Sequence, residues 1–293
     1  MIVGTATLLL LFATGSIAGG IGAMTGIGGG LLIVPALVLA FGVPVKVAVA
    51  TSLVAVVATS NAAGSVYVGR GLTNMRLGMT LELATTLGAI AGGVTAALLS
   101  DSVIAGAFAA VTLVTAVSLV RRGPEEAPSR VRTALHEARP EGEGYEVRGR
   151  LAGAYHDAAH GRMVEYEAER LPVGLAISFV AGGVSGLLGV GGGFLKVPAM
   201  HLGMGVPLKV AAATSNFMIG VTAAASLFVY YGRGSVHPLV AAPVALGVVL
   251  GALVGTRLQA RSSTRLLTQM LVVLLVAGAV QMALKSAGAW HGP

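Results

Sequence analysis

The sequence predicts an all-α polytopic membrane protein built from two homologous five-helix repeats in inverted orientation. First, 55 % of the 293 residues are hydrophobic and only 11 % are charged, whereas about a quarter of the residues in soluble domains are charged. Second, apolar runs of roughly 20 residues, the length that crosses a hydrocarbon layer as a helix, recur along the chain. Third, the sequence aligns with itself at an offset of 163 residues.

Each element follows from an apolar run and the breaks around it. The first apolar stretch has no basic residue before it and outlasts a signal peptide, so it is expected to be a membrane helix. Alternating strand patterns are missing, which favours a helical bundle over a barrel. About ten membrane segments are expected, and two of them are short because a dozen helical residues cover only about half of a membrane. The expected helices are 3–26, 30–42, 46–68, 75–99, 102–120, 172–190, 193–203, 209–231, 236–257 and 264–286.

A charged segment divides the two halves. Ten of the 12 acidic residues and nine of the 19 basic residues lie within 121–171, so this segment is nearly neutral and the remainder is strongly basic. We therefore predict a first transmembrane repeat over 1–120, a charged cytoplasmic linker over 121–171 and a second repeat over 172–293. The linker stretch "MVEYEAERLP" is expected to form a charged helix that leads into the next span. His156 and His160 have helical i, i+4 spacing, but without a third ligand no metal site is predicted.

The two halves are copies of each other. Of the 53 residue pairs that join 19–71 to 182–234, 27 are identical, which is far beyond chance. Five crossings per copy, an odd number, would place the second copy upside down in the membrane. Ten crossings with both termini outside put most short loops rich in Lys and Arg in the cytoplasm. The alternative of eight crossings with the N-terminus inside would leave the arginine cluster of 257–265 outside.

Each copy contains three consecutive glycines that interrupt the apolar pattern. A nucleotide-binding fingerprint is excluded because Leu31 stands where its last glycine is needed, and no Gly-Lys-Ser/Thr sequence is present. Short, glycine-interrupted segments at matching positions of two halves are typical of a transporter site, and helix starts attract anions. A packing kink without a ligand is the alternative. The helices that follow add Thr-Ser pairs at one offset, along with further polar residues such as Thr59 and Thr222. The predicted substrate-binding residues are Gly28, Gly29, Gly30, Thr51, Ser52, Gly191, Gly192, Gly193, Lys196, Thr214, Ser215 and Asn216.

Two charged residues within the predicted spans are functional candidates, Lys196 and Glu82. Lys196 stands three residues past the second glycine run, where the first copy has Ile33. Ionisable groups in membrane segments are functional candidates, so Lys196 is expected to bind an anion unless it extends to the interface. Glu82 is the only acidic residue inside a predicted span. It is a candidate proton relay or counter-ion of Lys196, or else an interfacial carboxylate near the start of its helix.

The repeated pattern "GxGGGxLxVPxLxLxFGVPxKxAxATS" resembles the sulfite exporter TauE/SafE family, also called the 4-toluene sulfonate uptake permeases. The resemblance covers both halves. It implies transport of sulfite, sulfoacetate and other organosulfonates across the inner membrane. It also implicates the two glycine runs, Pro35, Pro198 and the two Thr-Ser pairs. The linker is longer than a minimal connection between the halves.

These observations predict a secondary transporter of small sulfur-containing anions that works by alternating access at a midplane site. The alternatives are an anion channel with a continuous pore and a receptor that uses 121–171 as its effector. No set of hydrolytic residues or Walker motif is present, and the chain has no cysteine, so neither an enzyme nor a cofactor is expected. The expected partners are a small anion and the lipid bilayer of a bacterial or archaeal cytoplasmic membrane, and not nucleic acid. Monomer and homodimer both remain open.

Overall fold

The computed structural model describes residues 4–25, 28–121, 151–157, 162–258 and 264–287. A helix lies at each of the ten predicted ranges, and most bounds agree within two residues. The first half contains α1 (Thr5–Thr25), α2 (Gly30–Ala40), α3 (Val45–Gly69), α4 (Met75–Leu98) and α5 (Asp101–Arg121). The second contains α6 (Leu171–Leu188), α7 (Gly193–Pro198), the π-helical turn η1 (Ala199–Gly203), α8 (Leu208–Tyr231), α9 (Pro238–Leu258) and α10 (Thr264–Ser286).

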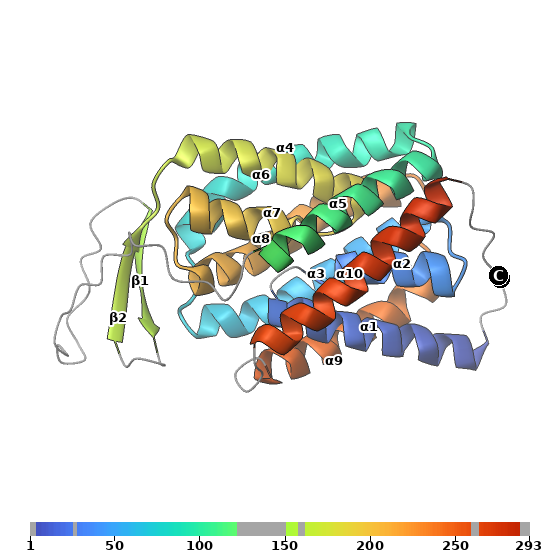
Figure 1. The fold of residues 1–293 in the computed structure, drawn as a ribbon, viewed down its shortest axis with the longest axis horizontal. Helices are drawn as coiled ribbons and strands as arrows, with labels where there is room; N and C mark the ends of the chain where they lie inside the picture. The colour runs from blue at the N-terminus through green and yellow to red at the C-terminus, as the bar shows by residue number, and fades with distance from the viewer. Residues whose placement is uncertain (1–3, 26–27, 122–150, 158–161, 259–263, 288–293) are drawn as a thin grey trace.

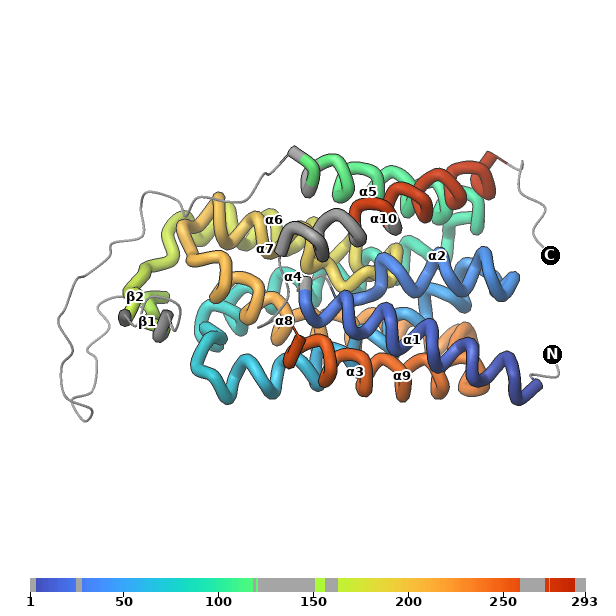
Figure 2. Tube along the Cα trace, turned by 60° about the horizontal axis from the view of Figure 1, so that its bottom comes forward, coloured from blue at the N-terminus to red at the C-terminus, as the bar shows by residue number. Residues whose placement is uncertain are grey.

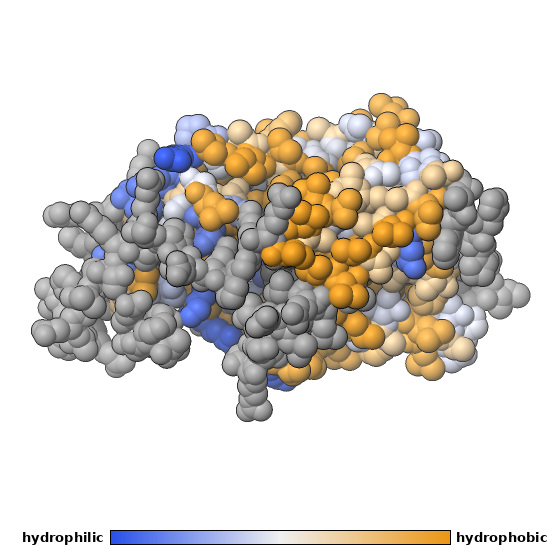
Figure 3. Space-filling view, in the orientation of Figure 1, coloured by the Kyte–Doolittle hydropathy of each residue, from blue (hydrophilic) through white to orange (hydrophobic). Residues whose placement is uncertain are grey.

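The chain is a multi-pass membrane protein. Within the described residues, α1, α3, α4, α6, α8 and α9 are long and apolar enough to cross a membrane. On α4, large exposed apolar side chains recur every three or four residues and form a lipid-facing stripe that includes Leu83, Leu87, Val94 and Leu98. Apolar residues cover much of the body in Figure 3, and hydrophilic ones gather toward one end. Ten membrane segments remain a prediction, because α2 has only 11 residues.

The long helices pack in pairs that join the two halves. Helix α1 packs on α9, α4 on α6 and α3 on α8, while α5 and α10 lie side by side on one face (Figures 1 and 2). Glycines bring the backbones of two pairs together. A Cβ atom at Gly92 on α4 would lie 2.0 Å from the Gly183 carbonyl oxygen on α6, and one at Gly251 on α9 would lie 2.0 Å from that of Ser16 on α1. Small residues allow this approach where lipid offers no hydrophobic drive for association.

Two helical hairpins, α1–α2 and α6–α7, enter the bundle from opposite ends. Helix α1 begins at the end where α10 finishes, whereas α6 begins at the end that carries the β-strands (Figures 1 and 2). Helices α2 and α7 each lie toward the end from which their hairpin started. The tips touch, because a Cβ atom at Gly30 would lie 2.4 Å from the Gly189 carbonyl oxygen. The hairpins therefore meet inside the bundle.

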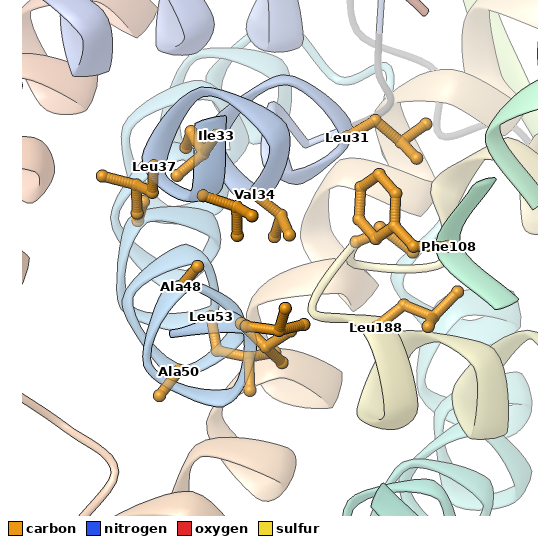
Figure 4. Packing of buried hydrophobic residues seen from close by; sticks show 14 of the residues in the cluster. Leu31, Ile33, Val34, Leu37, Ala48, Ala50, Leu53, Phe108 and Leu188 are labelled. Atoms are coloured by element: carbon orange, nitrogen blue, oxygen red, sulfur yellow. The ribbon is translucent and has the colours of Figure 1, made fainter. Parts of the chain in front are cut away.

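The core surrounds α2, which is apolar on all sides and is buried accordingly. Its side chains Leu31, Ile33, Val34 and Leu37 are at most 2 % exposed. Figure 4 shows Leu31 of α2 beside Phe108 of α5, with Leu188 at the end of α6 facing the same cluster. This core holds the first glycine turn against the end of α6.

The predicted charged helix before α6 is wrong. Residues Arg162–Glu167 form strand β2, which pairs antiparallel with β1 (Ala152–Asp157). Val164 and Tyr166 are buried while Glu165 and Glu167 are exposed, which is the period of two expected of a half-buried strand. His156 lies in β1, so the helical spacing assumed for the two histidines does not hold. His160 and linker residues 122–150 lie outside the described residues.

Candidate functional site

The glycine runs produce two turns of matching shape. Gly28 and Gly29 have φ of +88° and +70°, and Gly191 and Gly192 have φ of +77° and +73°. L-residues with a side chain rarely adopt these values, which explains the glycines. Each new helix then starts with hydrogen bonds to the middle glycine, and that from Lys196 N to Gly192 O measures 3.1 Å. The position of Lys196 on the first turn of α7 follows from this start.

Both turns face the same two side chains. A Cβ atom at Gly28 would lie 3.3 Å from Ile219 Cγ2 and 3.7 Å from Val56 Cγ1, and one at Gly191 would lie 2.8 Å and 3.1 Å from these atoms. Val56 on α3 and Ile219 on α8 are themselves 163 residues apart. The glycine turns of the two halves therefore pack against the same two apolar side chains. We call this region the glycine junction and define it as Gly28–Gly30, Gly189–Gly193, Val56 and Ile219.

Two of the four hydroxyls of the predicted site have hydrogen bonds within the described residues. Ser52 Oγ donates to the Gly189 carbonyl oxygen at 2.8 Å and so ties α3 to the glycine junction. Thr214 Oγ1 accepts the backbone N–H of Asn74 at 3.0 Å, before the start of α4. Thr51 Oγ1 and Ser215 Oγ are buried without a hydrogen-bond partner among the described residues.

Asn216 lies beside α3 and bonds to it and to its own helix. Its backbone carbonyl accepts the Ser60 hydroxyl, and its Nδ2 donates to the Ala212 carbonyl on its own helix at 3.1 Å. All twelve predicted binding residues are buried. The structure gathers the glycine turns and Ser52 at one point, whereas Thr214 and Asn216 occupy other contacts of α8.

The two buried charges lie next to each other. Lys196 Nζ is 3.8 Å from Glu82 Oε2, and it donates to Thr222 Oγ1 at 2.7 Å. Thr222 Oγ1 in turn lies 2.7 Å from Glu82 Oε1, which also accepts the Thr86 hydroxyl at 3.2 Å. Lys196 is 1 % exposed and Glu82 is 7 % exposed. Helices α4, α7 and α8 thus share one polar cluster, defined as Glu82, Lys196 and Thr222.

Thr222 is the member of this cluster that the predicted site lacks. Two features of the sequence point to it. It is identical to Thr59 at the offset of 163 residues. It also stands seven residues after Ser215, and this spacing puts both side chains on one face of a helix. Its contact with Glu82 spans 140 residues, so only the packing of α4 on α8 reveals it.

A second polar region lies where α3 begins and α8 ends. A pocket of about 240 Å³ is lined by Lys46, Gly93, Ala97, Tyr230, Arg233 and Ser235. Lys46 Nζ lies 4.0 Å from Asp101 Oδ1, so part of its charge is neutralised. No group of three His, Asp or Glu side chains in the described part of the chain is placed to hold a metal ion.

Comparisons with known proteins agree that the chain resembles membrane transporters. The family model described as sulfite exporter TauE/SafE matches residues 11–282. The chain is also similar to the probable membrane transporter protein YunE of Bacillus subtilis (strain 168). The two are 29 % identical over 248 residues, which cover 82 % of this chain and 84 % of that protein. No solved structure matches the chain.

Proposed function

The chain belongs to the sulfite exporter TauE/SafE family of membrane transporters, and from this membership we propose that it carries small sulfur-containing anions by secondary transport. The substrate class comprises sulfite, sulfoacetate and other organosulfonates. Each is a compact oxyanion, so its site needs a positive charge and hydrogen-bond donors in a protein interior.

Lys196 is the observation that carries this proposal within the fold. Its side chain is 1 % exposed and stands one helical turn after Gly192, where the two halves meet. A charge at such a place is expensive and marks a substrate or ion pathway in membrane proteins. The ammonium can donate to an anion oxygen, and the neighbouring Thr222 hydroxyl offers a second polar contact.

Alternating access would arise from two inverted copies that rock against each other. The matched hydrogen bonds of the halves support this arrangement. Tyr67 Oη donates to the Ala23 carbonyl and Tyr230 Oη to that of Gly186, both at 3.2 Å and at the offset of 163 residues. The opposite directions in which α1 and α6 enter the bundle also support it (Figure 1).

Burial favours a carrier over a channel. Ser52 and Thr214 are 0 % exposed and Lys196 is 1 % exposed. A continuous water-filled pore past these residues would leave them accessible. A closed interior is expected of a carrier between its outward-open and inward-open states.

Counterflow in proteoliposomes tests the proposal. Purified protein is reconstituted with unlabelled sulfite or 4-toluenesulfonate inside, and labelled anion is added outside. We expect saturable uptake that rises with internal anion, and none in protein-free liposomes. Conductance without counterflow would instead identify a channel, and binding without flux would identify a receptor.

A thermal-shift screen tests the substrate class. Sulfite, sulfate, thiosulfate, sulfoacetate and matched carboxylates are added to the detergent-solubilised protein. A ligand that binds only the folded state raises the melting temperature, so we expect stabilisation by one or more of the sulfur oxyanions. Stabilisation by cations alone would contradict the assignment.

A further inference from the structure

The polar cluster of Glu82, Lys196 and Thr222 holds one positive and one negative charge in the interior. The carboxylate and the ammonium are 3.8 Å apart, and the Thr222 hydroxyl lies 2.7 Å from both. Without a substrate the net charge of the cluster is zero, so burying the pair costs less than burying either ion without its partner.

Among the described residues of α4, α6, α7 and α8, no other charged side chain faces this pair. Helix α6 has no charged residue between Leu171 and Leu188, and the described residues of α8 carry none after Lys209. From α4 the neighbour is the Thr86 hydroxyl. The other buried titratable side chain on the α7–η1 segment is His201, whose Nδ1 lies 2.8 Å from the Val206 carbonyl oxygen. That contact needs a proton on Nδ1, because a carbonyl can only accept.

An arriving anion upsets this charge balance. If it binds the Lys196 ammonium, Glu82 is left as a second negative charge beside it, and the closed site carries a net charge of −1. Like charges at short range in a low-dielectric interior favour protonation of the carboxylate. A proton on Glu82 returns the loaded site to neutrality.

Thr222 can accommodate both states of Glu82. Its hydroxyl has one proton and two lone pairs, and it lies within reach of both Glu82 Oε1 and the Met218 carbonyl oxygen, at 2.7 Å and 3.0 Å. While Glu82 is ionised, Thr222 donates to it. Once Glu82 is protonated, the carboxylic acid donates to Thr222, and the threonine turns its own proton to Met218. No buried group loses its partner in the exchange.

From these contacts we propose that Glu82 couples transport to protons, with one proton taken up for each monovalent anion that binds Lys196. The inference rests on the proposed transport function and names its driving ion. The positions related to this cluster by the repeat offset hold no charge. Lys196 and Thr222 correspond to Ile33 and Thr59 of the first copy, and Glu82 corresponds to Ala245 of the second. Thr59 bonds the Ala55 carbonyl on its own helix.

The test uses 4-toluenesulfonate, which stays ionised at all relevant pH values, so that any pH effect comes from the protein. Proteoliposomes with the full chain are clamped at zero membrane potential, and a pH gradient is imposed. We expect accumulation on the alkaline side of about tenfold per pH unit, because one proton moves with each anion. A membrane potential without a pH gradient should drive no net accumulation.

Substitutions assign the effect to a residue. Glu82→Gln should abolish accumulation driven by the pH gradient, and any flux that remains should respond to membrane potential. The matched control His201→Gln should keep the pH response. If Glu82→Gln does not fold, Glu82→Asp and the wild-type measurement still decide the question. Wild-type flux that follows potential and ignores the pH gradient would overturn proton coupling alone, whereas no flux or counterflow with any sulfur anion would overturn the transport function itself.

Discussion

At the residue scale, the hydroxyl of Thr222 lies 2.7 Å from Lys196 Nζ and 2.7 Å from Glu82 Oε1. Thr222→Val keeps the shape of the side chain but leaves both charged groups without this contact. Removing one partner of a buried hydrogen bond costs about 1–3 kcal/mol, so we expect a loss of this size in the free energy of unfolding, together with reduced flux. Thr222→Ser should restore both.

The first copy supplies the control for this substitution. Thr59 is the counterpart of Thr222, is also buried, and bonds only a carbonyl of its own helix among the contacts seen here. Thr59→Val should therefore cost less than about 1 kcal/mol and leave the flux near that of the wild type. If Thr59→Val and Thr222→Val reduced stability and flux equally, the hydrogen bonds of Thr222 to Lys196 and Glu82 would contribute nothing beyond those of an ordinary buried threonine.

A second residue-scale prediction concerns the ion pair itself. Lys196→Ile introduces the first-copy residue but leaves Glu82 buried without its partner, which costs about 3–5 kcal/mol for a buried pair. Adding Glu82→Ala, which introduces the residue that the second copy has at the equivalent position, Ala245, should recover most of the lost stability, because replacing both ions by apolar groups is often neutral. Thermal unfolding of both variants measures the recovery. Flux should be lost in both, and a double variant less stable than Lys196→Ile would contradict the pairing.

The sequence suggested part of this site. Glu82 is the only acidic residue inside a predicted span and Lys196 carries the opposite charge inside another, so a pairing between them was a reasonable expectation. The contact of Thr222 with Glu82 depends on the packing of α4 on α8, and periodicity within one helix does not specify how two helices pack. For the same reason the engagement of Thr214 with the backbone of Asn74 was not foreseen. The assignment of the predicted residues to substrate binding stays a prediction.

At the element scale, the pairing of α4 with α6 depends on particular glycines. A Cβ atom at Gly92 would lie 2.0 Å from the Gly183 carbonyl oxygen, whereas one at the adjacent Gly93 would meet Val229 side-chain atoms at 3.4 Å or more. Gly92→Ala should therefore push the two backbones apart and cost at least about 1–3 kcal/mol. Thermal unfolding in detergent measures the loss.

Gly93→Ala is the matched control, since it makes the same chemical change one residue away. It should be neutral or slightly stabilising, because alanine favours helix over glycine by about 1 kcal/mol. If both variants lost the same stability, the loss would come from helix propensity or membrane insertion. The close contact of α4 with α6 would then not be its cause.

The β-hairpin is an element that docks on the bundle through polar contacts of Asn74 and through an apolar face. Asn74 Nδ2 donates to Tyr166 Oη at 3.1 Å, while Asn74 Oδ1 caps α4 by accepting Leu77 N. Burial raises the pKa of the Tyr166 hydroxyl, so it stays protonated at neutral pH. Val164 and Tyr166 pack in one cluster with Leu77 and Met204.

Removing the two partners of this contact should have unequal effects. Tyr166→Phe loses one hydrogen bond and should cost about 0.5–1.5 kcal/mol. Asn74→Ala also removes the helix cap, which adds about 1 kcal/mol. Limited proteolysis of the hairpin should speed up in both variants, and unfolding measurements should rank Asn74→Ala as the less stable. Unchanged proteolysis in both would argue against docking through this contact.

The elements also show where sequence patterns succeed. Helix bounds were predicted well because glycine and proline stop helices for local backbone reasons. The hairpin was missed because the acidic composition of 162–169 outweighed its alternation of buried and exposed residues. That alternation was visible in "MVEYEA", where Val164 and Tyr166 fall on one face.

At the scale of the whole molecule, the orientation of the two halves is the same whether or not the hairpins α1–α2 and α6–α7 cross the membrane. Helix α2 has 11 residues, about 16 Å of helix, which is half of a membrane. A hairpin that enters and leaves on one side adds no net crossing, and neither do two full crossings. Whether each hairpin is re-entrant or crosses twice, the loop after α3 lies on one side of the membrane and the loop after α8 on the other. The sidedness proposed for the repeats therefore does not depend on how the hairpins are counted.

This argument predicts that equivalent turns of the two copies face opposite sides of the membrane. The chain has no cysteine, so single substitutions report accessibility without a background. Arg70 and Arg233 are exposed, follow α3 and α8, and occupy equivalent positions of the repeat. Arg233→Cys should react with a membrane-impermeant maleimide in intact cells, and Arg70→Cys should react only after permeabilisation. Positively charged short loops are enriched in the cytoplasm, and Arg76→Cys at the start of α4 should behave as Arg70→Cys does. Labelling of both arginine positions from one side would mean that the copies are parallel, and an inverted-repeat carrier would then be excluded.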